Sequence, residues 1–298
     1  MTTLRGISWN HTRGFTSIVA AAQRFEELHP EVSIRWEKRS LQAFADASMA
    51  KLATEFDLII MDHPHTALAA TEGLLLPFED WLPAKFLADQ AANSVGESHN
   101  SYRFADKQWT LASDAATPIA TWRPDLVERH KLTLPQTWDD VLELARRGFV
   151  TVPAFPIDVL MHSYMFSAAL GHEPFSTDGI APDDVLAQAL TELQRLVALC
   201  ASACLERNPI RMYEWMSQTD DPHAAYCPFA YGYSNYSRPR YAKHLLRAGG
   251  LVSFNGRRLR STLGGAGIVV SAKTMNARAA MDFAQFAASP EVQKGIYF

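Results

Sequence analysis

The sequence predicts an α/β protein that folds into two compact units. Strand-like and helix-like segments alternate through residues 4–61, and a further strand and helix follow within residues 264–290. A chain of 298 residues, of which 48% are hydrophobic and 20% charged, is long enough to bury more than one core.

Three strands separated by two helices are expected at the N-terminus. Residues 4–9 form the first strand, an alternating pattern at residues 32–36 predicts the second, and residues 56–61 are an apolar run that only Asp57 interrupts. Such a run is typical of a parallel strand that is covered on both faces. Two apolar helix faces lie between the strands; their members are Phe15, Ile18, Val19, Ala22, Phe25 and Leu28, then Leu41, Phe44, Met49 and Leu52. This order predicts a parallel sheet, whose ligands bind beyond the carboxyl ends of the strands.

Polar and aromatic side chains stand at the end of each of these three strands. The candidates for ligand contact in this part of the chain are Trp9, Asn10, His11, Arg39, Asp62, His63 and His65. Core packing is an alternative role for Trp9, a turn cap for Asp62, and a solvated surface position for Arg39. The histidines and Asp62 also have the chemistry of metal ligands, but Pro64 alters the geometry between His63 and His65, so we expect no metal.

The overall charge gives no reason to expect nucleic acid or an anionic membrane as a partner. The formal net charge is -4 and the pI is near 6.2. The sequence contains no apolar run of the roughly 20 residues that a transmembrane helix requires. The opening residues MTTLRGISWN lack the features of a secretion signal, which leaves a trimmed chain and a cytoplasmic protein as alternatives. The three cysteines cannot all pair with one another, and we expect buried free thiols at Cys200 and Cys204.

Most of the elements that the sequence predicts in the middle of the chain are helices. In the segment PQTWDDV at residues 135–141, Thr137 can cap a helix together with Asp140, and Trp138 provides an apolar anchor. Asn208 and Pro209 stop the helix expected at residues 182–199 or follow closely after it. The remaining expected elements are a strand at residues 149–152, helices at 156–171, 182–199 and 241–246, and a return towards the first unit at 251–255.

Three segments in this order resemble the extracellular solute-binding proteins of ABC importers, in their sugar-binding branch. They are the crossing segment at residues 111–126, the helix start at Thr137–Trp138, and the returning strand and helix at residues 264–290. The resemblance implies the two-lobed α/β fold of type 2 periplasmic binding proteins, in which each lobe is a mixed sheet flanked by helices and hinge crossings join the lobes. It places lobe 1 at residues 1–113 and 252–298, and lobe 2 at residues 114–251.

The same resemblance implies the function. A periplasmic monomer would capture a small polar or aromatic ligand, such as a sugar, polyol or organic acid, between its lobes and deliver it to an ABC transporter permease. Neither catalysis nor a cofactor is needed, because affinity comes from burying the ligand and closure of the hinge supplies the signal. Relatives continue beyond the point where this chain ends, so the C-terminal part of the ligand cleft is the least defined.

A tyrosine-rich segment at residues 226–238 is the richest in groups that could contact such a ligand. The candidates there and in the crossing segment are Asp114, Tyr231, Tyr233, Asn235, Tyr236 and Arg238. Aromatic rings cover the apolar face of a sugar, while hydroxyl, amide and guanidinium groups fix its orientation. Core or surface roles are the alternative for the tyrosines, a turn cap for Asp114, and a solvated position for Arg238.

Three other functions remain open at this point. A cytoplasmic carrier or sensor on the same scaffold agrees with the lack of a secretion signal. A ferric-ion binder would use Tyr233, Tyr236, His11 and Asp62, which have the right ligand chemistry. A metal-dependent hydrolase is the least favoured, because the sequence has no nucleophile elbow, phosphate-binding loop, paired zinc motif or dinucleotide fingerprint.

Overall fold

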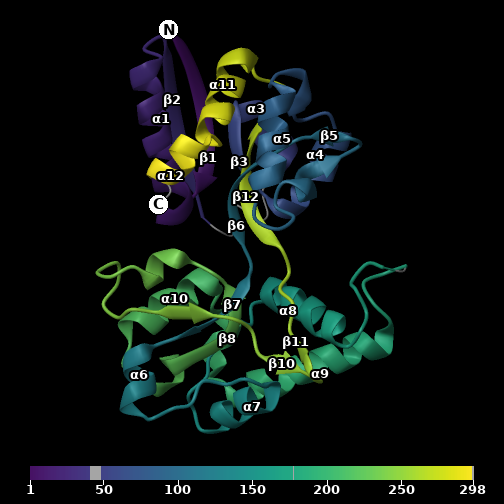
Figure 1. Ribbon diagram of the computed structural model, residues 1–298, viewed down its shortest axis with the longest axis vertical. Coiled ribbons are helices and arrows are strands. Elements are labelled where there is room, and N and C mark those ends of the chain that lie inside the picture. The colour runs from purple at the N-terminus through teal and green to yellow at the C-terminus, as the bar shows by residue number, and fades with distance from the viewer. Residues whose placement is uncertain (41–47, 177, 297–298) are drawn as a thin grey trace. The chain divides into compact units, whose positions relative to one another are not determined.

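The structure is a computed structural model, which describes residues 1–40, 48–176 and 178–296. The chain divides into two compact units (Figure 1). Unit 1 comprises Met1–Ala115 and Leu263–Phe298, and unit 2 comprises Ala116–Thr262. The chain therefore passes from one unit to the other twice, at residues 115–116 and 262–263.

The second passage differs from the one that the sequence predicted. We expected the return at residues 251–252, but the structure keeps the chain in unit 2 up to Thr262. The intervening residues form an antiparallel hairpin of β10 (Ser253–Phe254) and β11 (Arg257–Arg258). Four apolar side chains on and beside this hairpin are buried in the core of unit 2, which explains why it stays there; they are Leu251, Val252, Phe254 and Leu259.

The sheet of unit 1 has five strands in the order β2-β1-β3-β12-β6. The strand bounds are β1 (Thr2–Trp9), β2 (Val32–Arg39), β3 (Leu58–Asp62), β6 (Leu111–Ala116) and β12 (Gly264–Val270). As predicted, β1 pairs in parallel with both β2 and β3. The returning strand β12 runs antiparallel to β3, with Ala266 opposite Asp62.

Helices cover both faces of this sheet. Their bounds are α1 (Ser17–Leu28), α3 (Met49–Glu55), α4 (Thr66–Thr71), α5 (Ala84–Asn93), α11 (Ala277–Ala287) and α12 (Pro290–Ile296). Leu58 and Ile60 of β3 pack with α1 and α11, whereas Ile59 and Met61 pack with α3 and α4. This alternation confirms that the apolar residues 58–61 are buried on both faces of the strand. Leu41 and Phe44, expected in the second helix, lie outside the described residues.

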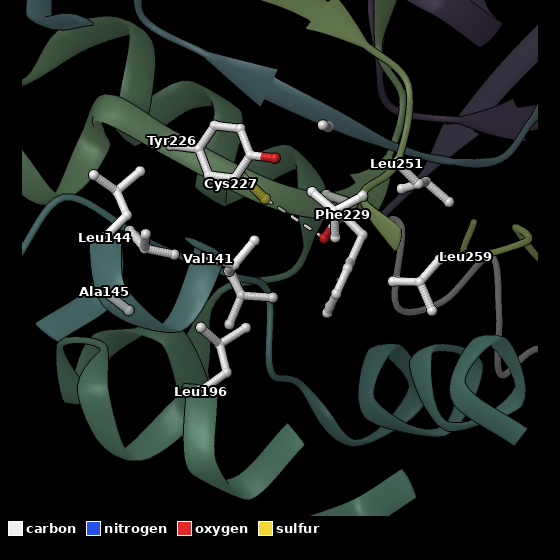
Figure 2. Close-up of a cluster of buried hydrophobic side chains, with 14 of the residues drawn as sticks. Val141, Leu144, Ala145, Leu196, Tyr226, Cys227, Phe229, Leu251 and Leu259 are labelled. Atoms are coloured by element: carbon white, nitrogen blue, oxygen red, sulfur yellow. Dashed lines mark hydrogen bonds between the residues drawn. The ribbon is translucent and has the colours of Figure 1, made fainter. Parts of the chain in front are cut away.

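Unit 2 contains a three-stranded sheet in the order β8-β7-β9 and five longer helices among its described residues. The strands are β7 (Pro118–Trp122), β8 (Tyr226–Tyr231) and β9 (Arg247–Gly249). The helices are α6 (Pro124–Arg129), α7 (Trp138–Arg146), α8 (Pro156–Ala169), α9 (Asp183–Leu199) and α10 (Pro209–Gln218). Figure 2 shows side chains of α7 and α9, such as Val141 and Leu196, in the same core as Phe229 of β8.

Three expectations for unit 2 were wrong. Residues 149–152 are not a strand, because only an isolated bridge joins Val150 to Tyr226. Asn208 and Pro209 do not end a helix but start α10, since the Asn208 side chain accepts a hydrogen bond from the Arg211 N–H. Residues 241–246 are not helical, because their amides donate to other elements: His244 N–H to Ser217 and Leu246 N–H to Tyr236.

No helix among the described residues has the length and apolar character needed to cross a bilayer.

The predicted start of α7 is confirmed in detail. The Thr137 side chain accepts a hydrogen bond from the Asp140 N–H at 3.2 Å, and the Asp140 carboxylate accepts from the Thr137 N–H at 2.9 Å. This reciprocal pair is a capping box, which satisfies two backbone donors that the helix itself leaves unpaired. Trp138 follows directly and is 3% exposed. The cap therefore fixes the point at which Trp138 enters the core.

We expect Thr137→Ala to lower the free energy of unfolding by about 1 kcal/mol, because the cap hydrogen bond is lost. Urea denaturation of both proteins measures the difference. Thr191→Ala is the matched control, since Thr191 is an exposed threonine within α9 and should change stability by less than about 0.5 kcal/mol. Equal effects of the two substitutions would show that the capping box contributes nothing specific.

Candidate functional site

The parallel strands of unit 1 bring three predicted residues to one edge of the sheet. Trp9, Arg39 and Asp62 are the last residues of β1, β2 and β3. Trp9 and Arg39 are opposite each other in the register, and the Asn10 N–H donates to the Arg39 carbonyl at 2.7 Å. We call this edge, together with the turn after β1 and the neighbouring end of β6, the carboxyl edge of unit 1.

The charge of Arg39 is partly buried at this edge. Burial lowers the pKa of its guanidinium to about 10, and the nearby carboxylate of Asp62 opposes that effect. Arg39 is therefore still a cation at neutral pH, and the negative charge of Asp62 stabilises this charged form. Asp62 itself is half-buried, whereas Asn10 is exposed.

His11 starts the turn that follows β1. This turn is a short π-helical segment, Thr12–Thr16, and His11 Nδ1 accepts a hydrogen bond from the Arg13 N–H at 3.1 Å. Burial, with a further contribution from the Arg13 charge, lowers the pKa of His11 to about 4. The imidazole is consequently neutral at physiological pH, and its proton is on Nε2 because Nδ1 acts as an acceptor.

Arg13 is a part of this edge that we did not predict. Its Nε lies 2.6 Å from Oδ2 of Asp114, and its guanidinium carbon lies 5.7 Å from the centre of a Trp9 ring. Burial raises the pKa of Asp114, and the Arg13 charge partly offsets this. The only signal in the sequence was a cation two residues beyond His11, which does not distinguish Arg13 from a solvated arginine.

Tyr102 was also missed, because it lies in a short helical turn, Asn100–Tyr102, far from any predicted strand end. It is 1% exposed, and the charges of Asp62 and Asp114 add to burial in raising its pKa. These effects place Tyr102 near the same two carboxylates. The structure thus brings together six of the predicted residues with Arg13 and Tyr102; the predicted ones are Trp9, Asn10, His11, Arg39, Asp62 and Asp114.

The remaining two predicted residues of unit 1 lie just after β3. They begin and end a short helical turn, His63–His65, and His65 is half-buried and directly precedes α4. Within the described ranges, no group of three or more histidine, cysteine, aspartate or glutamate side chains is suited to hold a metal ion.

The tyrosines of unit 2 follow the end of β8. Tyr231 is half-buried and its hydroxyl lies 2.9 Å from that of Thr262. A short helical turn, Ser234–Ser237, comes next, and three predicted side chains around it are buried: Tyr233 at 9%, Asn235 at 7% and Tyr236 at 4% exposure. Arg238 is exposed at the end of the turn.

Tyr213 packs against this tyrosine segment, and no pattern in the sequence indicated it. Its ring centre lies 6.2 Å from that of Tyr233 and 5.6 Å from that of Tyr236. Its hydroxyl donates to the Ala230 carbonyl at 3.2 Å and lies 3.2 Å from the Thr121 hydroxyl. Tyr213 belongs to α10, the helix that the sequence did not predict, so no pattern linked it to the site.

A shallow groove of about 320 Å³ lies elsewhere on unit 1, between α1 and β2. Phe15, Val19, Ile34 and Trp36 are among the residues that line it. None of the predicted contact residues does so, and the groove gives no further information about the site.

Residues 20–297 match the family model of the bacterial extracellular solute-binding proteins. The chain belongs to this family. No curated protein matches the sequence at a significant level. The family assignment confirms the predicted resemblance, and it means that related proteins bind solutes outside the cytoplasm.

Solved structures of other solute-binding proteins have the same fold. T. maritima MalE3 with bound maltose is 14% identical, with a TM-score of 0.79 over 98% of this chain and 78% of that one. An ABC transporter solute-binding protein from Agrobacterium radiobacter K84 in complex with ribitol is 17% identical, with a TM-score of 0.82 over 99% and 78%. Another from Agrobacterium vitis S4 with bound D-mannitol is 14% identical, with a TM-score of 0.79 over 99% and 74%. These similarities confirm the two-lobed α/β fold.

One buried acid of this solute-binding protein lies apart from the predicted contact residues. Asp158, in the first turn of α8, is 3% exposed, and His162 one turn later is 1% exposed. Within the part of the chain that the structure describes, Asp158 Oδ2 and His162 Nε2 have no hydrogen-bond partner. Burial raises the pKa of Asp158 to about 7 and lowers that of His162 to about 3. His162 is therefore neutral at physiological pH, and Asp158 keeps its proton up to a much higher pH than an ordinary aspartate.

Ionisation of Asp158 should destabilise the folded protein. Its pKa in the unfolded chain is about 3.9, so the folded state retains a proton that the unfolded state has lost. Ionisation of Asp158 by itself should lower the free energy of unfolding by up to about 4 kcal/mol as the pH rises from about 4 to about 8, whereas His11 and His162, whose pKa values are lowered in the folded state, should raise it up to about pH 6.5. Urea denaturation of the wild type and of Asp158→Asn across this range isolates the Asp158 contribution, because the stability of the wild type relative to the variant should fall as the pH rises. An equal slope in the variant would assign the pH dependence to other groups.

Proposed function

We propose that this solute-binding protein captures a neutral sugar or polyol at the carboxyl edge of unit 1 and delivers it to an ABC importer. The observation that carries the proposal is the chemistry of this edge. It combines an indole, a neutral imidazole and two arginines, each of which is close to a carboxylate. The indole of Trp9 is an aromatic ring of the kind that covers the apolar face of a sugar.

The charges at the carboxyl edge favour a neutral ligand over an ion. Arg13 forms an ion pair with Asp114, and the Arg39 charge is met by that of Asp62. Two cations and two anions give no net charge, so an ionic ligand would gain little from the edge as a whole. Charged groups that are already balanced still donate and accept strong hydrogen bonds, which is what a ligand with many hydroxyl groups requires.

The similar structures agree with this ligand class, since they hold maltose, ribitol and D-mannitol. Binding of such a ligand needs no chemical step, and we assign none to the protein. The family is extracellular, and we propose the periplasm as the place where capture occurs. An ABC permease is the proposed recipient of the ligand.

A thermal-shift screen with ribitol, D-mannitol and maltose tests the ligand class. A ligand at 100 times its Kd adds about 2.7 kcal/mol to the stability of the folded form, which should raise the Tm by several degrees. Citrate and ferric citrate are the ionic comparisons, and the ferric salt also tests the metal-binding alternative. A shift with the ionic compounds alone would contradict the proposal.

Asp62→Ala should weaken binding of the best compound from this screen by at least about tenfold, because a charge-assisted hydrogen bond to the ligand is lost. The Tm without ligand should fall as well, because Arg39 loses the carboxylate that offsets its partly buried charge, so the affinity is measured well below the Tm of the variant. Isothermal titration calorimetry measures the affinity. Asp80→Ala is the matched control, since Asp80 is an exposed acid of unit 1 that pairs with Lys107. A wild-type affinity in Asp62→Ala would remove Asp62 from the site.

We do not extend the same expectation to Tyr233. Tyr233 is part of the core of unit 2 and its ring contacts Tyr213. Removing the ring would leave a cavity and lower the Tm, so this variant cannot separate binding from folding.

A further inference from the structure

The ion pair between Arg13 and Asp114 joins the turn after β1 to strand β6. Arg13 Nε lies 2.6 Å from Asp114 Oδ2, and the two side chains are only 18% and 12% exposed. A pair that is this well shielded from water is short and directional, and it holds its two segments in one geometry. Its net contribution to stability is small by comparison, because the attraction is offset by the loss of hydration of both charges.

The turn that Arg13 anchors also packs against Trp9. A Cβ atom at Gly14 would lie 2.3 Å from the Trp9 indole, so only a glycine lets the backbone approach the ring so closely. The Arg13 guanidinium lies near the same indole, and the Arg13 N–H donates to His11 Nδ1. The orientation of the indole and the hydrogen-bonding state of the imidazole therefore depend on the conformation of one turn.

The other end of the ion pair is fixed by the backbone. Gly265 of β12 has a φ of +121°, and a Cβ atom there would lie 2.3 Å from the Asp114 carbonyl oxygen. The strands β6 and β12 are neighbours in the sheet, so Asp114 is held between its own strand pairing and this close contact. The chain leaves unit 1 directly afterwards, beyond Ala115. Asp114 is thus a rigid point of attachment for the turn.

We propose that Arg13 is a positioning residue, which holds the turn that begins at His11 and packs on Trp9 against Asp114 in the geometry that binds the ligand. This inference rests on the proposed function of the carboxyl edge. Its physical basis is preorganisation: a turn that is already ordered loses less conformational entropy when the ligand binds. Without the ion pair, the turn would have to be ordered by the ligand itself, and part of the binding energy would be lost.

A double-mutant cycle with Arg13→Gln and Asp114→Asn tests the proposal. Affinities for ribitol, D-mannitol and maltose are measured by calorimetry for the wild type, each single variant and the double variant. We expect each single substitution to weaken binding at least tenfold, the double variant to be no weaker than the worse single one, and Arg13→Lys to recover part of the affinity. Arg24→Gln is the matched control, since Arg24 forms an exposed ion pair with Glu27 on α1.

Two measurements on the ligand-free protein distinguish positioning from direct contact with the ligand. Nitrogen chemical shifts of the His11 ring report its tautomer, and the indole cross-peak of Trp9, assigned with Trp9→Phe, reports the surroundings of the ring. Both should change in Arg13→Gln and in Asp114→Asn, and neither should change in Arg24→Gln. A loss of affinity with unchanged signals would mean that Arg13 contacts the ligand itself, and the positioning role would be wrong.

The remaining outcomes also decide the question. Wild-type affinity in Arg13→Gln, or additive effects in the double variant, would overturn the inference. If the wild type binds none of the three compounds, the proposed ligand class fails, and the ligand-free signals alone then test the role of Arg13. Changed His11 and Trp9 signals would support it, and unchanged signals would reject it.

Discussion

The parallel pairing of β1 with β2 and β3 is the constraint on which the candidate site depends. Parallel strands end at the same edge of a sheet, so residues that are far apart in the chain meet there. Trp9, Arg39 and Asp62 come together for this reason alone. The apolar residues inside the strands make the pairing stable, and the polar residues at the strand ends give the edge its chemistry.

Burial of charge is the second constraint on this edge. Arg39 and Asp114 lose much of their contact with water, and burial shifts their pKa values towards the neutral forms. Each is close to an opposite charge, which opposes the shift, so the edge holds charged groups without an excess of either sign. Such a surface can order the hydroxyl groups of a neutral ligand through strong hydrogen bonds.

The two units support their aromatic residues in different ways. In unit 1, Trp9 is held by its own turn, through the close approach of Gly14 and the cation of Arg13. In unit 2, the tyrosine segment rests on Tyr213 of α10, which contacts two of its rings. Both arrangements limit the freedom of the aromatic side chains before any ligand is present, and this lowers the entropic cost of binding.

The sequence by itself determined the elements whose signals are local. The pattern of apolar residues, either a short run or a repeat every two or 3.6 residues, located β1, β2, β3, α1 and α9. The capping pair of Thr137 and Asp140 located the start of α7. The strand ends then followed, and with them Trp9, Arg39 and Asp62.

Only the tertiary structure decided what depends on distant partners. Residues 241–246 take their hydrogen bonds from other elements, residues 251–262 stay in unit 2 because its core accepts their side chains, and Arg13 is distinguished from a surface arginine by Asp114, 101 residues away. A local pattern indicates which conformation a segment favours. An ion pair or a buried contact between distant segments produces no such pattern in the neighbouring residues, so the sequence does not predict it.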